Sequence, residues 1–178
     1  MKRYQDWAKH EYSLRQRFIA LAFAAPFFLL IFPFLLIVAS NAIDAWLHLP
    51  RFSMGAVQWI VALLIIAAGL SLGRWSIQTQ IDIGRGTPVP MMPTMSLVVK
   101  GPFAYCRNPM TLGTYIAYSG LGVWIGSYSA LAIVLILTAV LLTYVKLWEE
   151  KELEIRFGDA YLEYKQNTPF ILPRLRRR

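Results

Sequence analysis

The stretch FIALAFAAPFFLLIFPFLLIVAS, from Phe18 to Ser40, decides the fold class, because it runs for about 23 residues without a charged side chain. At about 1.5 Å per residue, a helix of this length crosses the roughly 30 Å hydrocarbon core of a bilayer. Pro26 and Pro33 are expected to kink this helix, because proline removes a backbone hydrogen bond. The run is too long for the apolar region of a cleaved signal peptide, about 7–15 residues, so we expect a retained transmembrane helix.

Three further apolar blocks follow, in a chain whose 178 residues are 57% hydrophobic and only 16% charged. This composition excludes an ordinary soluble domain and indicates an integral membrane protein. We predict one all-α membrane domain, a helical bundle with transmembrane helices at residues 18–40, 56–73, 109–126 and 129–147. The remaining parts are predicted to be an interfacial arm (1–17), a cytoplasmic loop (74–108) and a cytoplasmic tail (148–178).

Glycine spacing in two of these spans indicates where helices could pack. Gly69 and Gly73, and again Gly122 and Gly126, have the small-xxx-small spacing that lets helix backbones approach closely. Glycine is also simply common in membrane helices, so this spacing does not by itself require packing. Only residues 126–128 separate the last two spans, which predicts a tight antiparallel hairpin.

The distribution of Lys and Arg predicts the orientation, because the cytoplasmic loops of membrane proteins are enriched in these residues. With four spans, all of the 18 Lys and Arg residues except Arg51 lie on one side of the membrane. We therefore expect both termini and the long middle segment to face the cytoplasm. The net charge of +8 then indicates attraction to anionic lipid headgroups, and nothing in the sequence looks like a nucleic-acid-binding fold.

Two polar segments on this side carry the candidate chemistry. The segment from Asp82 to Met110 is rich in glycine and proline, which disfavours a regular helix and leaves backbone groups available to a ligand. In the second segment, Glu149 and Glu150 lie at the membrane boundary, where a carboxylate is costly unless it is solvated or paired. Arg107 is a candidate partner, because a short hairpin brings the cytoplasmic ends of the last two spans together. The alternative is a solvated helix that simply continues out of the bilayer.

Other reactive side chains are few. Cys106 is the single cysteine, which excludes an internal disulfide, and we expect it to be structural although the neighbouring Arg107 could lower its pKa. His10 and His48 are far apart in the sequence, so no metal site is predicted.

Four short motifs occur in a fixed order around the predicted hairpin. They are GxGTPxP (84–90), LVxxGPF (97–103), RNPM (107–110) and EExxLxxxFGxxYxxY (149–164). In this order they resemble the isoprenylcysteine carboxyl methyltransferase and phospholipid methyltransferase superfamily, and the resemblance covers roughly residues 60–173. The resemblance implies S-adenosylmethionine as the cofactor, bound in a cytoplasmic pocket. The pocket would be formed by the loop before the third span, the cytoplasmic end of that span and the tail after the fourth.

The resemblance also implies roles for individual residues, three sets in all. The adenosine part of the cofactor would be contacted by Leu97, Val98, Val99, Gly101 and Phe103. The methionyl part would be lined by Arg107, Asn108, Pro109 and Met110, which occupy the family's Arg-His-Pro position. The cofactor's hydroxyl or amino groups would be bound by the paired acids Glu149 and Glu150. The candidate catalytic residues are Arg107, Asn108, Glu149 and Glu150.

The implied reaction is direct displacement at the sulfonium methyl group by a lipophilic or small acceptor that enters from the lipid side. A carboxylate or thiolate acceptor needs no base, whereas an amine must lose a proton, for which Glu149 or Glu150 is the local candidate. Asn108 stands where the family usually has histidine, and Thr111 where tyrosine is common. These two departures leave the acceptor open more than the use of the cofactor.

Two other classes of function compete with a methyltransferase. Small helical membrane reductases that act on sterols or enones use NADPH near a similar cytoplasmic tail. The adjacent glutamates suit a phosphate-rich cofactor poorly, and no dinucleotide-binding fingerprint is present. The third class is a non-catalytic membrane scaffold, supported only by the glycine faces and the basic tails. The sequence indicates membrane lipids and a small-molecule acceptor as partners, and does not indicate an oligomeric state.

Overall fold

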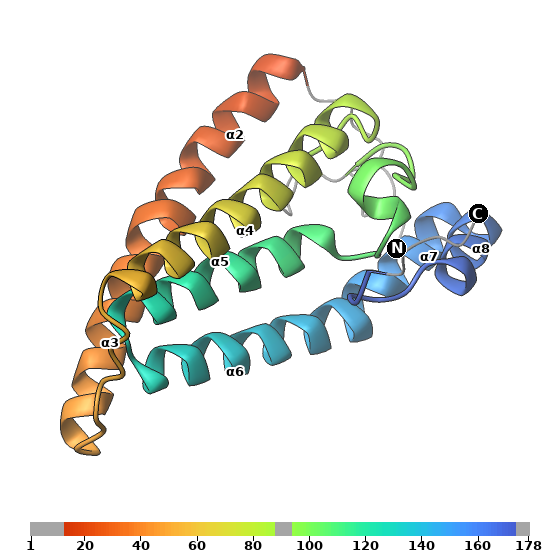
Figure 1. Ribbon diagram of the computed structural model, residues 1–178. Helices are drawn as coiled ribbons and strands as arrows, with labels where there is room; N and C mark the ends of the chain where they lie inside the picture. Colours follow the sequence, from red (N-terminus) through yellow and green to blue (C-terminus); the bar gives the residue numbers. More distant parts are fainter. Residues whose placement is uncertain (1–12, 88–93, 174–178) are drawn as a thin grey trace.

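The protein was analysed as a computed structural model that describes residues 13–87 and 94–173. Within these residues the structure is entirely helical, and the long helices lie side by side as a bundle (Figure 1). The all-α prediction is therefore confirmed. The first twelve residues of the predicted interfacial arm lie outside the part of the chain that the structure describes.

The first long helix begins at Leu14 rather than at the predicted residue 18. It consists of α2 (Leu14–Pro26), the π-helical turn η1 (Phe27–Ile31) and α3 (Phe32–Trp46). Ser13 starts it with a capping box, in which its hydroxyl accepts from the Gln16 amide at 3.3 Å and the Gln16 side chain accepts from the Ser13 amide at 2.8 Å. The helix widens into η1 directly after Pro26, at one of the two predicted kinks.

The second long helix, α4 (Ala56–Asp82), is longer than the predicted span at residues 56–73. The expected loop at 74–108 is therefore wrong in its first part, because residues 74–82 continue the helix. The polar residues after Gly73 end the apolar run without ending the helix, since the next strong helix breaker in the sequence is Gly84. Beyond it, the loop contains a 3₁₀ turn, η2 (Gly101–Ala104).

The last two predicted spans form the expected hairpin of α5 (Pro109–Ile125) and α6 (Tyr128–Tyr144). Gly126 ends α5 with a positive φ of 68°, and a side chain there would meet the carbonyl oxygen of Phe52. The helix of α6 does not stop at residue 147. It continues through the π-helical turn η3 (Val145–Glu149) into α7 (Glu150–Phe157), after which α8 (Asp159–Asn167) folds back (Figure 1).

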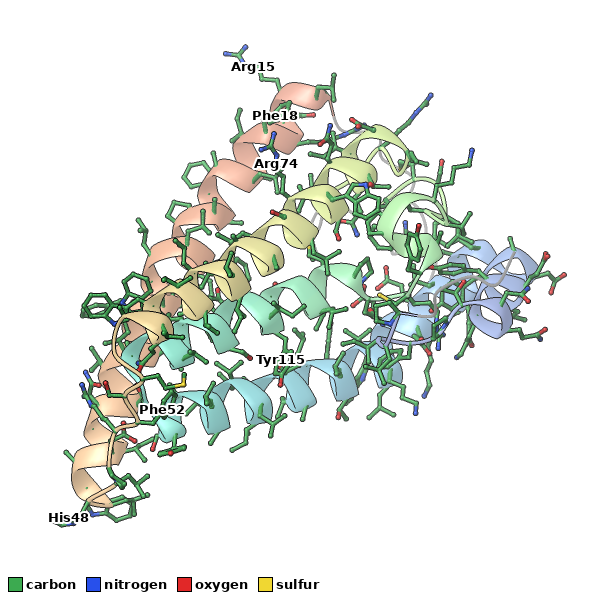
Figure 2. The ribbon with its side chains drawn as sticks, in the orientation of Figure 1. Arg15, Phe18, His48, Phe52, Arg74 and Tyr115 are labelled. Carbon is green, nitrogen blue, oxygen red and sulfur yellow. The ribbon has the colours of Figure 1, made fainter. Side chains whose placement is uncertain are left out.

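Among residues 13–87 and 94–173, three continuous helices are long and apolar enough to cross a membrane: Leu14–Trp46, Ala56–Asp82 and Tyr128–Phe157. The span predicted at residues 109–126 corresponds to the helix α5, which has 17 residues and is not one of these three. Figure 2 shows Arg15 and Arg74 near one end of the bundle and His48 and Phe52 near the other. The structure thus supports an integral membrane protein, with polar termini of its long helices at both ends.

Close backbone contact joins α4 to α5. A methyl group added at Gly113 would lie 2.8 Å from the carbonyl oxygen of Gly69 and 2.9 Å from the amide nitrogen of Gly73. A methyl group at Gly69 would in turn meet the backbone of Ala117. The predicted packing role of Gly69 and Gly73 is confirmed, and Gly113 is the partner that the spacing argument did not identify.

Candidate active site

The candidate site lies where α5 begins and where the α6–α7 helix emerges from the bundle (Figure 1). Asn108 is the N-cap residue of α5 and Pro109 occupies its first turn, where a missing amide hydrogen costs nothing. This arrangement fixes the direction of the chain at Arg107, immediately before the helix. Across from it, η3 widens the neighbouring helix just before Glu150. A π-helical turn rotates the side chains that follow it about the helix axis, so they point in a different direction.

Arg107 and Glu150 form a buried ion pair. Nη1 of Arg107 lies 2.5 Å from Oε1 of Glu150, and the two side chains are 11% and 3% exposed. The contact lacks the angle of a hydrogen bond, so Nε and Nη1 of Arg107 and Oε1 of Glu150 have no hydrogen-bond partner among the described residues. Buried polar atoms without a partner are costly, and they are satisfied in most proteins by protein, water or ligand. The pair therefore offers two donors and one acceptor to a bound molecule.

Lys165 supplies a second cation to Glu150. Its Nζ lies 2.9 Å from Oε2 of Glu150 and 2.7 Å from Oε1 of Glu154. Gly158, with a φ of 54°, makes the turn between α7 and α8 that brings Lys165 back to these two carboxylates. Hydrogen bonds to Glu154 and Glu150 raise the pKa of Lys165 above its ordinary value, so the ammonium form is favoured.

The segment after α8 crosses back over Arg107. The Arg107 amide donates to the carbonyl oxygen of Pro169 at 2.9 Å, and the Asn108 side-chain amide donates to the carbonyl oxygen of Phe170 at 2.9 Å. The guanidinium carbon of Arg107 also lies 5.4 Å from the centre of the Phe170 ring, within cation–π range. Residues 168–173, which we call the C-terminal strap, thus hold the entry to α5 and shield Arg107 from solvent.

Two tyrosines of α8 connect this helix to the site. Tyr164 donates from its hydroxyl to the carbonyl oxygen of Phe103 at 2.7 Å. Tyr161 is 1% exposed, and burial raises its pKa to about 12, to which the negative charge of Glu150 adds and which Arg107 opposes. Both phenols are therefore neutral near pH 7. They contribute a rigid, mostly apolar wall beside the charges.

A pocket of about 450 Å³ lies next to this wall, between the loop before η2 and α8. From the loop it is lined by Leu97, Val99 and Ala104, and from α8 by Ala160, Glu163 and Tyr164. Thr168 and Pro169 of the C-terminal strap also line it. Its lining does not include Arg107 or Glu150. The strap contributes Thr168 and Pro169 to the pocket and also contacts Arg107, through Pro169 and Phe170.

Only some of the predicted cofactor-binding residues line this pocket. Leu97 and Val99 line the pocket, whereas Val98 and Phe103 are buried in the loop's own packing. Gly101 has a φ of 60°, and a methyl group there would lie 3.0 Å from Oγ1 of Thr79 in α4, so its conformation has a structural reason. Pro109 is fully buried and Met110 is half-buried at the start of α5.

The two predicted acids, Glu149 and Glu150, have different surroundings in the structure. Glu150 is paired with Arg107, which the sequence offered as a candidate partner of either glutamate. Glu149 is exposed, and no hydrogen bond or ion pair of its side chain occurs among residues 13–87 and 94–173. Cys106 is 1% exposed, and burial raises its pKa, which fits the structural role expected for it rather than a reactive thiol.

Comparison with known proteins places this arrangement in a family. The family model described as phospholipid methyltransferase matches residues 57–160, which is more than half of the chain. The chain belongs to the phospholipid methyltransferase family. The matched part runs from α4 through α7 and includes both Arg107 and Glu150. Membership implies a membrane methyltransferase, as the four sequence motifs indicated.

One curated relative is similar to part of the chain. The cobalt-zinc-cadmium resistance protein CzcN of Cupriavidus metallidurans is 30% identical over 80 residues, or 45% of this chain. The match spans 37% of the relative's length. The chain is therefore similar to little more than a third of that protein.

Sequence reasoning missed two residues that contact the ion pair, Lys165 and Phe170. Lys165 was used only in counting Lys and Arg for the orientation, and no role in the site was predicted for it. Its spacing of four residues from Tyr161 nevertheless places both on one face of a helix. Phe170 follows the end of α8 and has no periodic pattern around it. Its position over Arg107 depends on the path of the C-terminal strap, which no local sequence signal indicated.

Proposed function

We propose that this protein is an S-adenosylmethionine-dependent methyltransferase that acts at the membrane surface, with its cofactor held at the Arg107–Glu150 pair. One observation carries the proposal. In a chain of a methyltransferase family, three buried polar atoms of this pair have no hydrogen-bond partner in the described structure. Structural ion pairs normally satisfy their atoms, whereas binding sites leave atoms for a ligand.

The residues present fit the proposed cofactor. Nε and Nη1 of Arg107 have no hydrogen-bond acceptor among the described residues, and a planar guanidinium suits the methionyl carboxylate. Oε1 of Glu150 has an ion-pair contact but no hydrogen-bond donor among the same residues, and a carboxylate oxygen suits an ammonium or a hydroxyl group. Leu97, Val99 and Ala104 provide apolar surface in the neighbouring pocket, where the adenosine part would lie.

S-adenosylmethionine would supply a methyl group on a sulfonium, whose carbon–sulfur bond breaks as the bond to the acceptor forms, leaving a neutral thioether. The protein's contribution is alignment and exclusion of water, which can lower the barrier by several kcal/mol without covalent catalysis. Arg107 would fix the methionyl end, and the C-terminal strap would exclude solvent. With an amine acceptor, the released proton would pass to the exposed Glu149 carboxylate, because Glu150 is held between two cations.

Exposed aromatic residues support four spans and a site at the membrane boundary. Trp59 of α4 stacks with Trp124 of α5 at 6.1 Å, and at the opposite end Trp75 of α4 lies 6.5 Å from Tyr105, just before α5. Trp and Tyr favour the two interfaces of a bilayer, and about 24 Å of helix separates the two α4 tryptophans. We infer that α5 spans the membrane between the same two levels. Trp148 then places Glu150 at the boundary.

The count of Lys and Arg residues supports a cytoplasmic location for this end of the bundle, for both termini and for the site. The acceptor would reach it from the bilayer, as a membrane lipid, another lipophilic molecule or a small molecule that bears a carboxylate, thiol or amine. A screen with labelled cofactor against prenylated thiols, phospholipids and small carboxylates would identify the acceptor class.

Calorimetric titration of the detergent-purified protein tests the proposal, with S-adenosylmethionine and reduced nicotinamide cofactor in separate runs. We expect binding of the first only, and a loss of affinity of at least about tenfold in Glu150→Gln and Arg107→Ala, because charge-assisted hydrogen bonds are lost. Asp159→Asn, an exposed acid on α8, is the matched control and should bind normally. Failure of the wild-type protein to bind S-adenosylmethionine would overturn the proposal, and binding of the nicotinamide cofactor instead would indicate a reductase.

A further inference from the structure

Glu150 divides its two carboxylate oxygens between two cations. Oε1 faces Arg107 at 2.5 Å, whereas Oε2 lies 2.9 Å from Nζ of Lys165. Lys165 is itself fixed by Glu154, one helical turn after Glu150 on α7, at 2.7 Å. Both ion pairs of Lys165 are to carboxylates, and this lysine lies beyond the part of the sequence that matches the family.

This division has a consequence for Arg107. A guanidinium and a carboxylate that are free to rotate favour a bidentate contact, with two parallel hydrogen bonds that use two donors and both oxygens. Here Oε2 is engaged by Lys165, and the contact to Arg107 is through one oxygen without hydrogen-bond geometry. Nε and Nη1 of Arg107 consequently have no acceptor within the described residues. Lys165 thus keeps open the donors that a ligand carboxylate needs.

We propose that Lys165 is a positioning residue of the cofactor site: by holding Oε2 of Glu150, it prevents Glu150 from closing on Arg107 and so preserves the carboxylate-binding face of Arg107. The inference rests on the proposed function, because it concerns the methionyl carboxylate of the cofactor. It also predicts which part of the cofactor is affected. Loss of Lys165 weakens recognition of the carboxylate and leaves recognition of the adenosine part unchanged.

The variant Lys165→Met retains most of the apolar stem and removes the charge. We expect the dissociation constant for S-adenosylmethionine to rise on the order of tenfold, since a charge-assisted hydrogen bond to the carboxylate is lost. Lys165→Arg still provides a donor to Oε2 and should bind within about threefold of wild type. Lys151→Met is the matched control, because Lys151 is an exposed lysine of α7 adjacent to Glu150 in the sequence.

Two further measurements separate positioning from a merely structural role. The first is competition by 5′-methylthioadenosine, which has the adenosine and thioether but no carboxylate, and whose affinity should be the same in Lys165→Met and wild type. The second is the double variant Lys165→Met with Glu150→Gln. A neutral amide cannot form the closed ion pair, so Lys165→Met should add no further loss in that background.

These experiments distinguish a failure of the Lys165 proposal from a failure of the proposed function. If the wild-type protein does not bind S-adenosylmethionine, both proposals are overturned. If it binds but Lys165→Met binds equally well, or loses affinity for 5′-methylthioadenosine to the same degree, only the positioning role is overturned. Should Lys165→Met fail to fold, Glu154→Gln releases Lys165 from its second anchor and should give a smaller loss in the same direction. An unchanged affinity in a folded Glu154→Gln would then overturn it.

Discussion

Two contacts of α5 contrast sharply, its packing on α4 and its junction with α7 and α8. Where α5 packs on α4, a methyl group added at Gly69 or at Gly113 would lie under 3 Å from backbone atoms of the other helix. At the junction, the contact is made by Arg107 and Glu150, which are buried and leave polar atoms without partners. The first contact gains stability from dispersion and close fit, whereas the second holds charges at a cost in desolvation.

The first contact supports folding, whereas the second is the one we propose for chemistry. A buried ion pair contributes little net stability, because the desolvation of two charges offsets their attraction. Close glycine packing has no comparable penalty, and membrane helices depend on it. We therefore expect substitutions where α4 and α5 pack to change the amount of folded protein, and removal of both charges at the junction to change ligand binding more than folding.

The largest effect should come from Gly113→Val. Its side chain would meet the backbone of Gly69 and Gly73, which cannot move aside as a flexible side chain does, so we expect a destabilisation of about 3 kcal/mol or more. Thermal unfolding in detergent, followed by size-exclusion chromatography, measures this. Gly73→Ala is the control, because a methyl group on Gly73 itself meets nothing within 4 Å. Equal melting temperatures of Gly113→Val and the control would contradict the packing role.

A second effect should appear in the double variant Arg107→Met with Glu150→Leu. Glu150→Leu alone leaves the buried Arg107 charge without its carboxylate, which costs about 3–5 kcal/mol for a buried pair, whereas Arg107→Met alone leaves Glu150 paired with Lys165. The double variant removes both charges, and Lys165 retains Glu154, so its stability should recover most of that loss. Its affinity for S-adenosylmethionine should nevertheless fall below detection in calorimetry. Retained binding in this variant would show that the pair is structural.

The sequence predicted a residue of the α4–α5 contact, but for the ion pair it left open which glutamate takes part. Glycine spacing identified Gly69 because helical periodicity is local, and charge cost at a membrane boundary identified Arg107 with either of two glutamates. Which glutamate faces inward depends on η3, a π-helical turn that shifts the facing of Glu150 relative to α6, and no spacing rule indicated it. The end of α4 at Asp82 was not predicted, because the length of an apolar run shows how much of the chain lies in the membrane and not where the helix ends.

Residues of the C-terminal part were the hardest to predict, because their contacts are set by tertiary structure. Lys165 reaches Glu150 only through the turn at Gly158, whose φ is 54°. Phe170 reaches Arg107 only through the C-terminal strap. Sequence patterns report on periodicity within one element, and these contacts lie between elements.

A smaller effect is expected for Phe170→Ala, which removes the ring beside the Arg107 guanidinium and keeps the backbone hydrogen bonds of the strap. A cation–π contact contributes about 0.5–2 kcal/mol, so the dissociation constant for S-adenosylmethionine should rise by roughly 2- to 30-fold. The melting temperature should change little. Leu172→Ala is the control, because Leu172 is 76% exposed in the same strap. A loss of affinity in both variants would attribute the effect to the strap as a whole and contradict a role of the ring.

The smallest effect should belong to Cys106, which lies one residue before Arg107 but is 1% exposed. Burial raises the pKa of its thiol, so the reactive thiolate is scarcer near pH 7 than for a free cysteine, and its fraction grows only as the pH rises through that raised value. We expect slow maleimide labelling of the folded protein at pH 7, and rapid labelling after unfolding in denaturant. Cys106→Ala should leave the affinity for S-adenosylmethionine within about twofold, because the thiol contributes packing rather than charge. Fast labelling of the folded protein that is suppressed by S-adenosylmethionine would instead place the thiol in the binding site. The site would then include Cys106 as well as Arg107.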